Sequence, residues 1–201
     1  MTTLLLVRHG ETDWNAAHRI QGSTDIPLND TGRAQAQETA ATLAAQFAGV
    51  RPVVVASDLA RARETAEIIA GALGVELQRT YPQLRERAYG IAEGLTITEY
   101  HERFGDWDRV IVEGAETPEH LRTRALGAAR RVVRDARRLH APQDVPVIAV
   151  SHGALIGQLL RHASGDTLPR PGERLANAST HTFLVERDRI GVLSYAAVPI
   201  G

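Results

Sequence analysis

The chain has 201 residues, a length that suits one well-cored domain. Its 23 basic side chains are all arginine and nearly balance its 24 acidic ones, so the formal net charge is −1. The lack of cysteine excludes disulfides, thiolate metal sites and a cysteine nucleophile, and the lack of lysine excludes Schiff-base chemistry. The near-zero charge argues against a general nucleic-acid-binding protein.

The first residues carry no recognisable targeting signal. The apolar run of residues 4–7 is shorter than the roughly 7–15 apolar residues of a signal-peptide core. No stretch of the sequence approaches the ~20 apolar residues that span a bilayer. We therefore expect a cytoplasmic protein that does not bind membranes.

Apolar strands and helical patterns alternate along the first half of the chain. The predicted strands here are residues 2–7, 52–56 and 75–78. Residues 29–47 predict a helix because they are alanine-rich with an apolar face. A second helix is predicted over residues 59–73, with Ser57 or Asp58 as its N-cap and Gly74 at its end.

The second half continues the alternation after an irregular stretch at residues 79–116. Thr117 and Pro118 predict the start of a helix that runs to about His140, and residues 154–163 predict another helix. The predicted strands are residues 145–150, 180–186 and 190–197, the last two as a hairpin.

This alternation predicts an α/β fold. We expect a three-layer sandwich in which helices cover both faces of a central sheet that is mixed but mostly parallel. The C-terminal hairpin would supply its antiparallel edge. Residues 79–116 would form a small cap excursion over one end of the sheet.

Three of the predicted strands end in residues that suit anion binding. Arg8 and His9 follow the first strand, Arg61 lies one turn into the helix after the second, and His152 and Gly153 follow the third buried strand. In open α/β sheets ligands bind beyond the carboxyl ends of the strands, where residues distant in sequence meet. Guanidiniums, imidazoles and backbone N–H groups beside glycine would bind a phosphate there.

Most other histidines and arginines have simpler interpretations. The arginines between residues 130 and 138 recur at helical spacing, which is typical of a solvated helix face. The histidines interpreted as structural or exposed are His18, His101, His120, His140, His162 and His181. No cluster has the spacing of a metal site, and we expect neither a metal nor a cofactor.

Four motifs in chain order resemble those of the histidine phosphatase superfamily, the phosphoglycerate-mutase-like proteins. Residues 6–15 read LVRHGETDWN and resemble the family's signature, while residues 19–22 read RIQG, as in its phosphatase branch. The family's second, third and last motifs are similar to residues 57–62 (SDLARA), 84–86 (LRE) with 93–95 (EGL), and 151–153 (SHG), respectively. The similarity spans about residues 4–180, so we expect one histidine-phosphatase-like domain over residues 1–201.

The resemblance implies a role for each matching residue. His9 would be the nucleophile that takes the phosphoryl group on a ring nitrogen, and Glu86 the general acid and then the base. Arg8, Arg61 and His152 would bind the phosphate oxygens, and the arginines would favour the neutral form of His9. The other expected substrate contacts are Asn15, Gln21, Gly22, Tyr89 and Gly153.

The implied activity is metal-independent hydrolysis of a small organic phosphomonoester through a phosphohistidine, by a histidine acid-type phosphatase. The alternative is a cofactor-dependent phosphoglycerate mutase, since residues 86–90 (ERAYG) resemble the mutase version of the third motif. The mutases carry a longer insertion with lysine and paired arginines, and this chain has no lysine. Hydrolysis is therefore the favoured expectation.

Two minor alternatives belong to other classes. Residues 149–153 approximate the nucleophile elbow of a serine esterase, with Ser151 as nucleophile and Asp166 and His181 following in the right order. A phospholigand-binding protein without turnover would keep the pocket alone. Residues 106–108 (DWD) superficially resemble an aspartyl phosphatase, but they do not follow a buried strand.

Substrate selection is expected to reside in the cap. Its aromatic side chains, which either pack locally or contact the leaving group, are Tyr89, Tyr100, Phe104 and Trp107. Its acidic side chains, which would disfavour polyanionic substrates if they face the pocket, are Glu99, Glu102, Asp106, Asp108 and Glu113. The expected partner is a small, modestly charged phosphomonoester, with no nucleic acid and no membrane.

Overall fold

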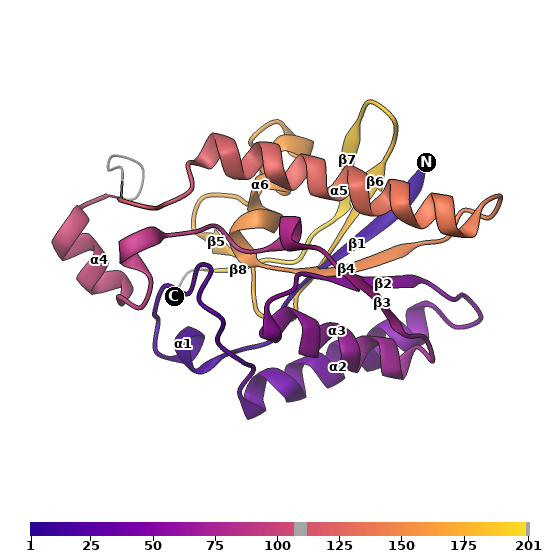
Figure 1. Ribbon diagram of the computed structural model, residues 1–201, viewed down its shortest axis with the longest axis horizontal. Helices are drawn as coiled ribbons and strands as arrows, with labels where there is room; N and C mark the ends of the chain where they lie inside the picture. Colours follow the sequence, from indigo (N-terminus) through magenta and orange to yellow (C-terminus); the bar gives the residue numbers. More distant parts are fainter. Residues whose placement is uncertain (107–111, 200–201) are drawn as a thin grey trace.

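A six-stranded sheet forms the centre of the computed structural model, which describes residues 1–106 and 112–199 (Figure 1). Its strands are β1 (Thr2–Arg8), β2 (Val53–Ala56), β3 (Leu77–Thr80), β4 (Val147–Ser151), β6 (Thr180–Val185) and β7 (Ile190–Ser194). The order across the sheet is β3-β2-β4-β1-β6-β7. Strands β3, β2, β4 and β1 are mutually parallel, and β6 pairs antiparallel with both β1 and β7. The sheet is therefore mixed and mostly parallel, as predicted.

Helices cover both faces of this sheet, which confirms the predicted three layers (Figure 1). On one face lie α2 (Asp30–Gln46) and α3 (Ala60–Ala72), and on the other α5 (Pro118–His140) and α6 (Gly153–Ser164). Successive residues of a strand point to opposite faces. Leu5 and Val7 accordingly pack against α2 and α3, whereas Leu4 and Leu6 pack against α5 and α6.

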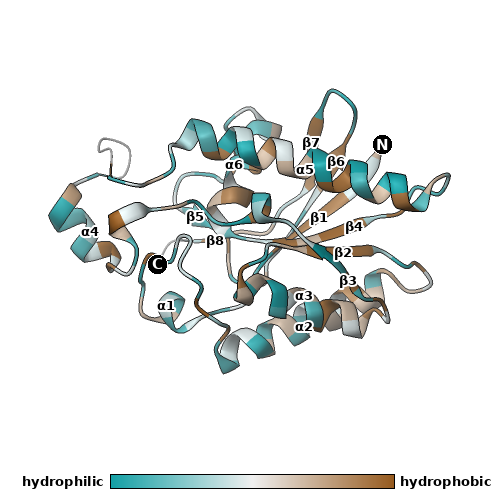
Figure 2. Cartoon of the chain, viewed as in Figure 1, coloured by the Kyte–Doolittle hydropathy of each residue, from teal (hydrophilic) through white to brown (hydrophobic). Residues whose placement is uncertain are grey.

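The central strands are hydrophobic along their length because both of their faces are buried (Figure 2). The helices that cover the sheet bury hydrophobic side chains where they meet it, and α5 shows alternating teal and brown stretches in the same view. Its buried side is made by alanines and valines, including Ala125, Ala129, Val132 and Val133. None of the helices in the described residues is long and apolar enough to cross a membrane.

The helix ends follow the sequence signals except at α3. Thr117 caps α5 through the His120 N–H, and Asn29 caps α2 through the Gly32 N–H. The predicted cap of α3 by Ser57 or Asp58 is wrong: its N-cap is Leu59, without a side-chain hydrogen bond. The carboxylate of Asp58 binds Arg85 instead, at 2.7 and 2.6 Å, and the Ala60 N–H donates to the carboxylate of Asp25 at 2.7 Å.

Residues 79–116 hold more regular structure than the sequence predicts. The strand expected at 75–78 lies two residues later, in β3. Beyond it come two short 3-10 helices, η1 (Pro82–Leu84) and η2 (Gly90–Ala92), and α4 (Ile97–Phe104). The cap has its own small core of Ile20, Ala92, Tyr100 and Val112, against which Tyr89 and Phe104 pack. Trp107 and Asp108 lie outside the described residues.

Three further short elements complete the chain. A four-residue helix, α1 (Asp13–Ala16), follows the loop after β1. The two-residue strands β5 (Glu173–Arg174) and β8 (Val198–Pro199) pair with each other apart from the main sheet.

Two backbone segments approach each other closely behind the loop after β1. A Cβ built on Gly10 would lie 2.3 Å from the carbonyl oxygen of Gly32, and one built on Gly32 would lie 2.1 Å from the carbonyl oxygen of Glu11. No side chain fits at these distances, because they are shorter than any van der Waals contact between carbon and oxygen in a packed protein. Glycine at both positions lets the first turn of α2 dock directly on this loop.

Candidate active site

A cavity of about 250 Å³ lies beyond the carboxyl ends of β1 and β4 and is lined partly by the cap. Residues from several of the sequence motifs meet there. The expected site residues that line it are Arg8, His9, Asn15, Gln21, Gly22, Arg61, Glu86 and Tyr89. The parallel register explains the meeting: Arg8 is paired with Ser151, so the residues that follow these two strands, His9 and His152, emerge side by side.

His9 is held in one orientation by hydrogen bonds on both of its ring nitrogens. Its Nδ1 lies 2.7 Å from the carbonyl oxygen of Gly10, and its Nε2 lies 3.2 Å from Nε of Arg61. A carbonyl only accepts and a guanidinium only donates, so Nδ1 carries the proton and Nε2 carries the lone pair. Burial, then Arg61 and Arg8, hold the pKa of His9 well below its usual 6.5, so the ring is neutral at pH 7.

Arg61 is fully buried and has no acidic partner in the part of the chain that the structure describes. Besides His9, it donates to the backbone oxygens of Thr24 and Gly22, each at 2.9 Å. Burial lowers the pKa of Arg61 to about 10, which still leaves it charged at neutral pH. A buried cation that is surrounded by neutral acceptors provides a strong attraction for an anion.

His152 is the N-cap residue of α6 and is completely buried beside His9, with ring centroids 5.0 Å apart. Neither of its ring nitrogens has a hydrogen-bond partner among the described residues, and the same is true of Nε of Arg8. Burial first, then the nearby Arg61, lowers the pKa of His152 well below 6.5. These unpartnered donors next to His9 are costly for the folded protein unless a ligand satisfies them.

Glu86 lies just after η1, at the N-terminal end of α6. Both of its carboxylate oxygens are 3.1 Å from the Ala154 N–H, and Oε1 also accepts from the Arg87 N–H at 2.9 Å. Unpaired N–H groups and the helix dipole stabilise a negative charge at this end of a helix. The carboxylate is thereby fixed at the edge of the cavity that contains His9.

The remaining expected contacts differ in how they face the cavity. The side-chain oxygen of Asn15 accepts from Thr12 and Asn177, so the amide NH₂ is its group left to bind an anion. Gly22 has a φ of +54° and presents its carbonyl to Arg61. Gly153 is not among the residues of this cavity: it lies against Arg8, where an added Cβ would come within 3.4 Å of Nε.

Three residues that support the site were not singled out from the sequence. Asn177 donates to the carbonyl of His9 and to Asn15, at 3.1 and 3.2 Å. Arg124 binds the carbonyls of Gln83, Arg85 and Glu86, and its charge is paired with Glu116 at 2.6 Å. Glu93, known only as part of a motif, accepts hydrogen bonds from Ser23, Thr24 and Tyr89.

Glu93 could have been found through the motif that contains it, but no pattern in the sequence distinguishes Arg124 and Asn177 from their neighbours. Arg124 belongs to a helix rich in arginine, and Asn177 stands in an irregular loop. Their partners are distant in sequence, so local propensities carry no trace of the contacts. Arg8 also has a partner that is distant in sequence, since its Nη1 donates to the backbone oxygen of Leu175.

The geometry does not support the serine esterase alternative. Ser151 is the buried last residue of β4, and its hydroxyl donates to the carbonyl of Leu84 at 2.8 Å. His181 instead lies against Ser179 and the Ala196 N–H, at 2.9 and 3.4 Å, and Asp166 is paired with Arg122. The three residues therefore do not form a triad, which requires the nucleophile and its base to be hydrogen-bonded.

Two further expectations about the site can be compared with the structure. The acidic residues of the cap that are described, Glu99, Glu102, Asp106 and Glu113, do not line this cavity. The sequence argument against polyanionic substrates, which required them to face the pocket, therefore loses its basis. Within the described residues no three histidine, aspartate or glutamate side chains are grouped to hold a metal ion.

A mixed sheet with a buried imidazole and two guanidiniums at the carboxyl ends of its strands is the arrangement of a phosphoryl-transfer site. Residues 4–197 match the family model of the histidine phosphatase superfamily, branch 1. The chain belongs to this superfamily, whose members include phosphatases and phosphoglycerate-mutase-like proteins.

Relatives of known name include both kinds of protein. The uncharacterized phosphatase PhoE of Bacillus subtilis is 40% identical over 192 residues, which cover 94% of this chain and 93% of that protein. The probable phosphoglycerate mutase GpmB of Yersinia pestis is 38% identical over 177 residues, which cover 87% of this chain and 79% of that one. A mycobacterial glucosyl-3-phosphoglycerate phosphatase, solved with VO₃, is structurally similar with a TM-score of 0.80, 26% identity and coverage of 98% and 100%.

Proposed function

We propose that the protein is a histidine acid-type phosphatase that hydrolyses phosphomonoesters through a phosphohistidine on Nε2 of His9. One observation carries this proposal above all. Nε2 of His9 accepts from Arg61, Arg8 lines the same cavity, and the ring of His152 lies 5.0 Å from that of His9. Among the described residues, Nε of Arg8 and both ring nitrogens of His152 have no partner. Such a set of donors binds the oxygens of a phosphoryl group and leaves a neutral nucleophile beside its phosphorus.

The first step would transfer the phosphoryl group to His9. Binding of the phosphate offers the Nε–H of Arg61 a charged oxygen in place of His9 Nε2, which frees the lone pair for attack. The bond between Nε2 and phosphorus forms as the ester bond breaks. Glu86, in its protonated form, gives its proton to the departing alkoxide, so the alcohol leaves neutral.

The second step would return His9 to its starting state. The Glu86 carboxylate takes a proton from a water molecule, whose oxygen attacks the phosphorus on the side vacated by the alcohol. The phosphorus–nitrogen bond breaks, inorganic phosphate leaves, and Nε2 regains its lone pair. The hydrogen bond from His9 Nδ1 to Gly10 keeps the ring in the same orientation through both steps.

The phosphate oxygens would be held by Arg8, Arg61, His152 and the Asn15 amide. Because the arginines carry fixed positive charge, they stabilise the charge that spreads over the equatorial oxygens during transfer. We accordingly propose that turnover needs no metal. The similarity to PhoE supports hydrolysis, whereas the similarity to GpmB makes mutase activity the alternative to be tested.

A panel of phosphomonoesters assayed in the presence of chelator would test the proposal. Release of inorganic phosphate should persist with chelator and should require His9. Isomerisation of phosphoglycerate, assayed in parallel with and without a bisphosphoglycerate primer, separates the two activities. Rapid isomerisation without net phosphate release would establish the mutase and overturn the phosphatase.

A further inference from the structure

A second cavity, of about 610 Å³, lies between α5, α6 and the loop that leads into β5. It borders the site described above. Tyr89 lines both cavities, and Gly153 and Ala154 line this one, although the Ala154 N–H binds Glu86. Glu86 therefore lies at the boundary between the two. If Glu86 protonates the leaving alcohol, the remainder of that alcohol would extend into this second cavity.

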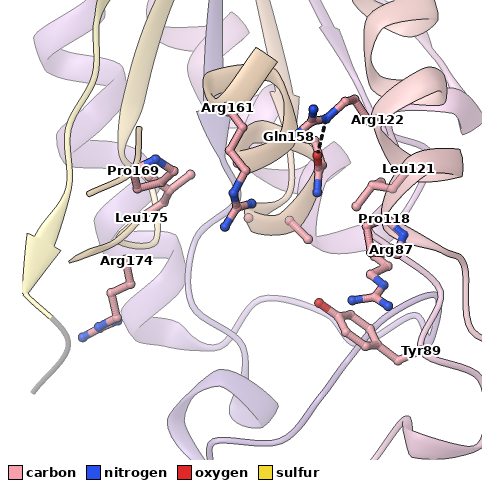
Figure 3. Close-up of a pocket in the computed structure, with 13 residues that line it drawn as sticks. Arg87, Tyr89, Pro118, Leu121, Arg122, Gln158, Arg161, Pro169, Arg174 and Leu175 are labelled. Atoms are coloured by element: carbon pink, nitrogen blue, oxygen red, sulfur yellow. Dashed lines mark hydrogen bonds between the residues drawn. The ribbon is translucent and has the colours of Figure 1, made fainter. Parts of the chain in front are cut away.

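The cavity is lined by four arginines and, among the described residues, by no acidic side chain. Figure 3 shows the guanidinium groups of Arg161 and Arg87 pointing toward its open centre, whereas Arg174 lies at the rim and points away in this view. Arg122 is different because it is already satisfied. It donates to Gln158 at 3.1 Å and pairs with Asp166 at 2.7 Å.

Arg161 and Arg174 make no ion pair and no side-chain hydrogen bond within the residues that the structure describes. Arg87 uses its Nε to bind the carbonyl of Glu116 at 2.9 Å, and its guanidinium lies 5.0 Å from the centre of the Tyr89 ring. Arg87 is thus held in place, while Arg161 extends from α6 without a partner. Positive charge gathered on a concave surface without counter-charge favours anions.

Apolar side chains lie between these charges. Leu121 and Pro118 come from α5, Pro169 from the loop before β5, and Leu175 from the position directly after β5. An organic anion can use both kinds of contact, the apolar side chains for its carbon stem and the charged ones to fix its orientation. The volume also exceeds that of the phosphate cavity more than twofold, at about 610 against 250 Å³. It therefore suits an organic group rather than a second bare phosphate.

We propose that this cavity binds the leaving group of the substrate and that Arg161, with Arg87, binds a second anionic group on it. The substrate class is then a phosphomonoester whose alcohol has an apolar stem and a terminal carboxylate or phosphate. This inference rests on the proposed phosphatase activity and specifies its substrate. It replaces the expectation of a small, modestly charged substrate, because those acidic cap residues that the structure describes do not line either cavity.

Matched substrates test the inference on the full chain. The compounds are ω-phosphonooxyhexanoate, its uncharged carboxamide ω-phosphonooxyhexanamide, and hexanediol bisphosphate, with p-nitrophenyl phosphate as the reference. Each is assayed as a substrate and as a competitor of p-nitrophenyl phosphate hydrolysis, so that a compound that binds but reacts slowly is still detected. We expect the carboxylate or the bisphosphate to be preferred over the carboxamide by ~10-fold or more, because charged hydrogen bonds contribute most to discrimination.

Arg161→Gln should reduce the ratio of carboxylate to carboxamide kcat/KM by ~10-fold. Arg134→Gln, an exposed arginine of α5 remote from this cavity, is the matched control and should leave the ratio unchanged. The relative rates of the carboxylate and the bisphosphate identify which anion the cavity prefers. Circular dichroism checks that both variants are folded.

The outcomes separate this inference from the proposed function. If p-nitrophenyl phosphate is not hydrolysed by the wild-type protein, the phosphatase proposal fails and this one fails with it. If it is hydrolysed but the charged compounds show no advantage over the carboxamide, only the second site is overturned. An advantage that survives Arg161→Gln unchanged would also overturn the assignment to this cavity.

Discussion

Nε of Arg61 donates a hydrogen bond to Nε2 of His9 across 3.2 Å, so a fully buried cation holds the ring atom that we propose as nucleophile. The contact fixes the tautomer of His9 and helps to keep its ring unprotonated. It also places the guanidinium next to the position that an incoming phosphoryl oxygen would take. Activation of the nucleophile and binding of the phosphate are therefore linked through one side chain.

Replacement of Glu86 should separate the two steps of the proposed reaction. General acid–base catalysis contributes roughly 10²–10⁴-fold, and Glu86→Gln should lose about that much turnover on an alkyl phosphate. p-Nitrophenol leaves without protonation, so this variant should still release one equivalent of it in a burst. An acid-labile phosphoprotein should then accumulate. A burst-free slow reaction with no labelled protein would contradict the role of Glu86 in the second step.

His9→Ala and Ser151→Ala should have opposite consequences. The first removes the proposed nucleophile and should abolish both labelling and turnover. The second removes a hydroxyl that binds the Leu84 carbonyl, and should lower the free energy of unfolding by ~1 kcal/mol with activity largely retained. Steady-state assays and urea unfolding measure both effects. An active His9→Ala protein together with an inactive Ser151→Ala protein would favour the esterase alternative after all.

Stability should decrease in mild acid because buried histidines stay neutral in the folded protein. Burial lowers the pKa of His181 to about 4, and the pKa values of His9 and His152 are also lowered. The unfolded chain takes up these protons as pH falls below 6.5, whereas the folded chain does not. Each such histidine therefore removes ~1.4 kcal/mol of stability per pH unit between its two pKa values, and none above pH 6.5.

The variant His181→Gln tests this linkage outside the proposed catalytic residues. Urea unfolding at several pH values between 7 and 4.5 should show a shallower loss of stability than in the wild type. The slope of unfolding free energy against pH should be smaller by an amount that corresponds to at most one proton. His162→Gln, at an exposed position of α6, is the matched control. Parallel curves for the wild type and His181→Gln would refute the assignment.

Gly10→Ala should destabilise the protein because the new methyl group would meet the backbone oxygen of Gly32. Overpacking against backbone that cannot move costs about 3 kcal/mol. Gly127→Ala, in the middle of α5 with nothing within 4 Å of the added Cβ, should instead stabilise by ~0.5–1 kcal/mol. Opposite signs in thermal or urea unfolding distinguish close packing from a general effect of replacing glycine.

Glu93→Ala should weaken both stability and substrate binding. Its carboxylate accepts hydrogen bonds from Ser23, Thr24 and Tyr89, and it thereby holds the loop whose carbonyls bind Arg61. We expect a loss of ~1–3 kcal/mol in unfolding free energy and an increase in KM. Glu102→Ala, an exposed acid of α4, is the control and should change neither. Wild-type KM in Glu93→Ala would exclude this supporting role.

The fold could be predicted because its main signals are local. Each central strand is an uninterrupted apolar run, and α5 begins with a threonine cap followed by proline. The missed helix α4 is only eight residues long, although Thr96 and Glu99 do form a capping box. The wrong cap at α3 has a tertiary cause, since Asp58 is drawn to Arg85, which lies beyond β3 in the chain.

The candidate site was predictable to the extent that its residues directly follow strands. His9 and His152 could be paired from the sequence because parallel strands bring their carboxyl ends to one edge. The second cavity, which we propose binds the leaving group, could not be predicted, since it depends on Arg161 and Arg87 approaching from separate elements. The acidic residues counted along the cap suggested that polyanionic substrates are disfavoured, but those that the structure describes line neither cavity.

The site also joins the two ends of the chain. The carbonyl of Leu175 binds Arg8, and Asn177 binds the carbonyl of His9, so contacts between residues more than 160 positions apart complete it. During synthesis the proposed nucleophile leaves the ribosome almost first and these partners almost last. The phosphate site therefore assembles only in the nearly finished protein, and the appearance of activity should report the final stage of folding rather than an early intermediate.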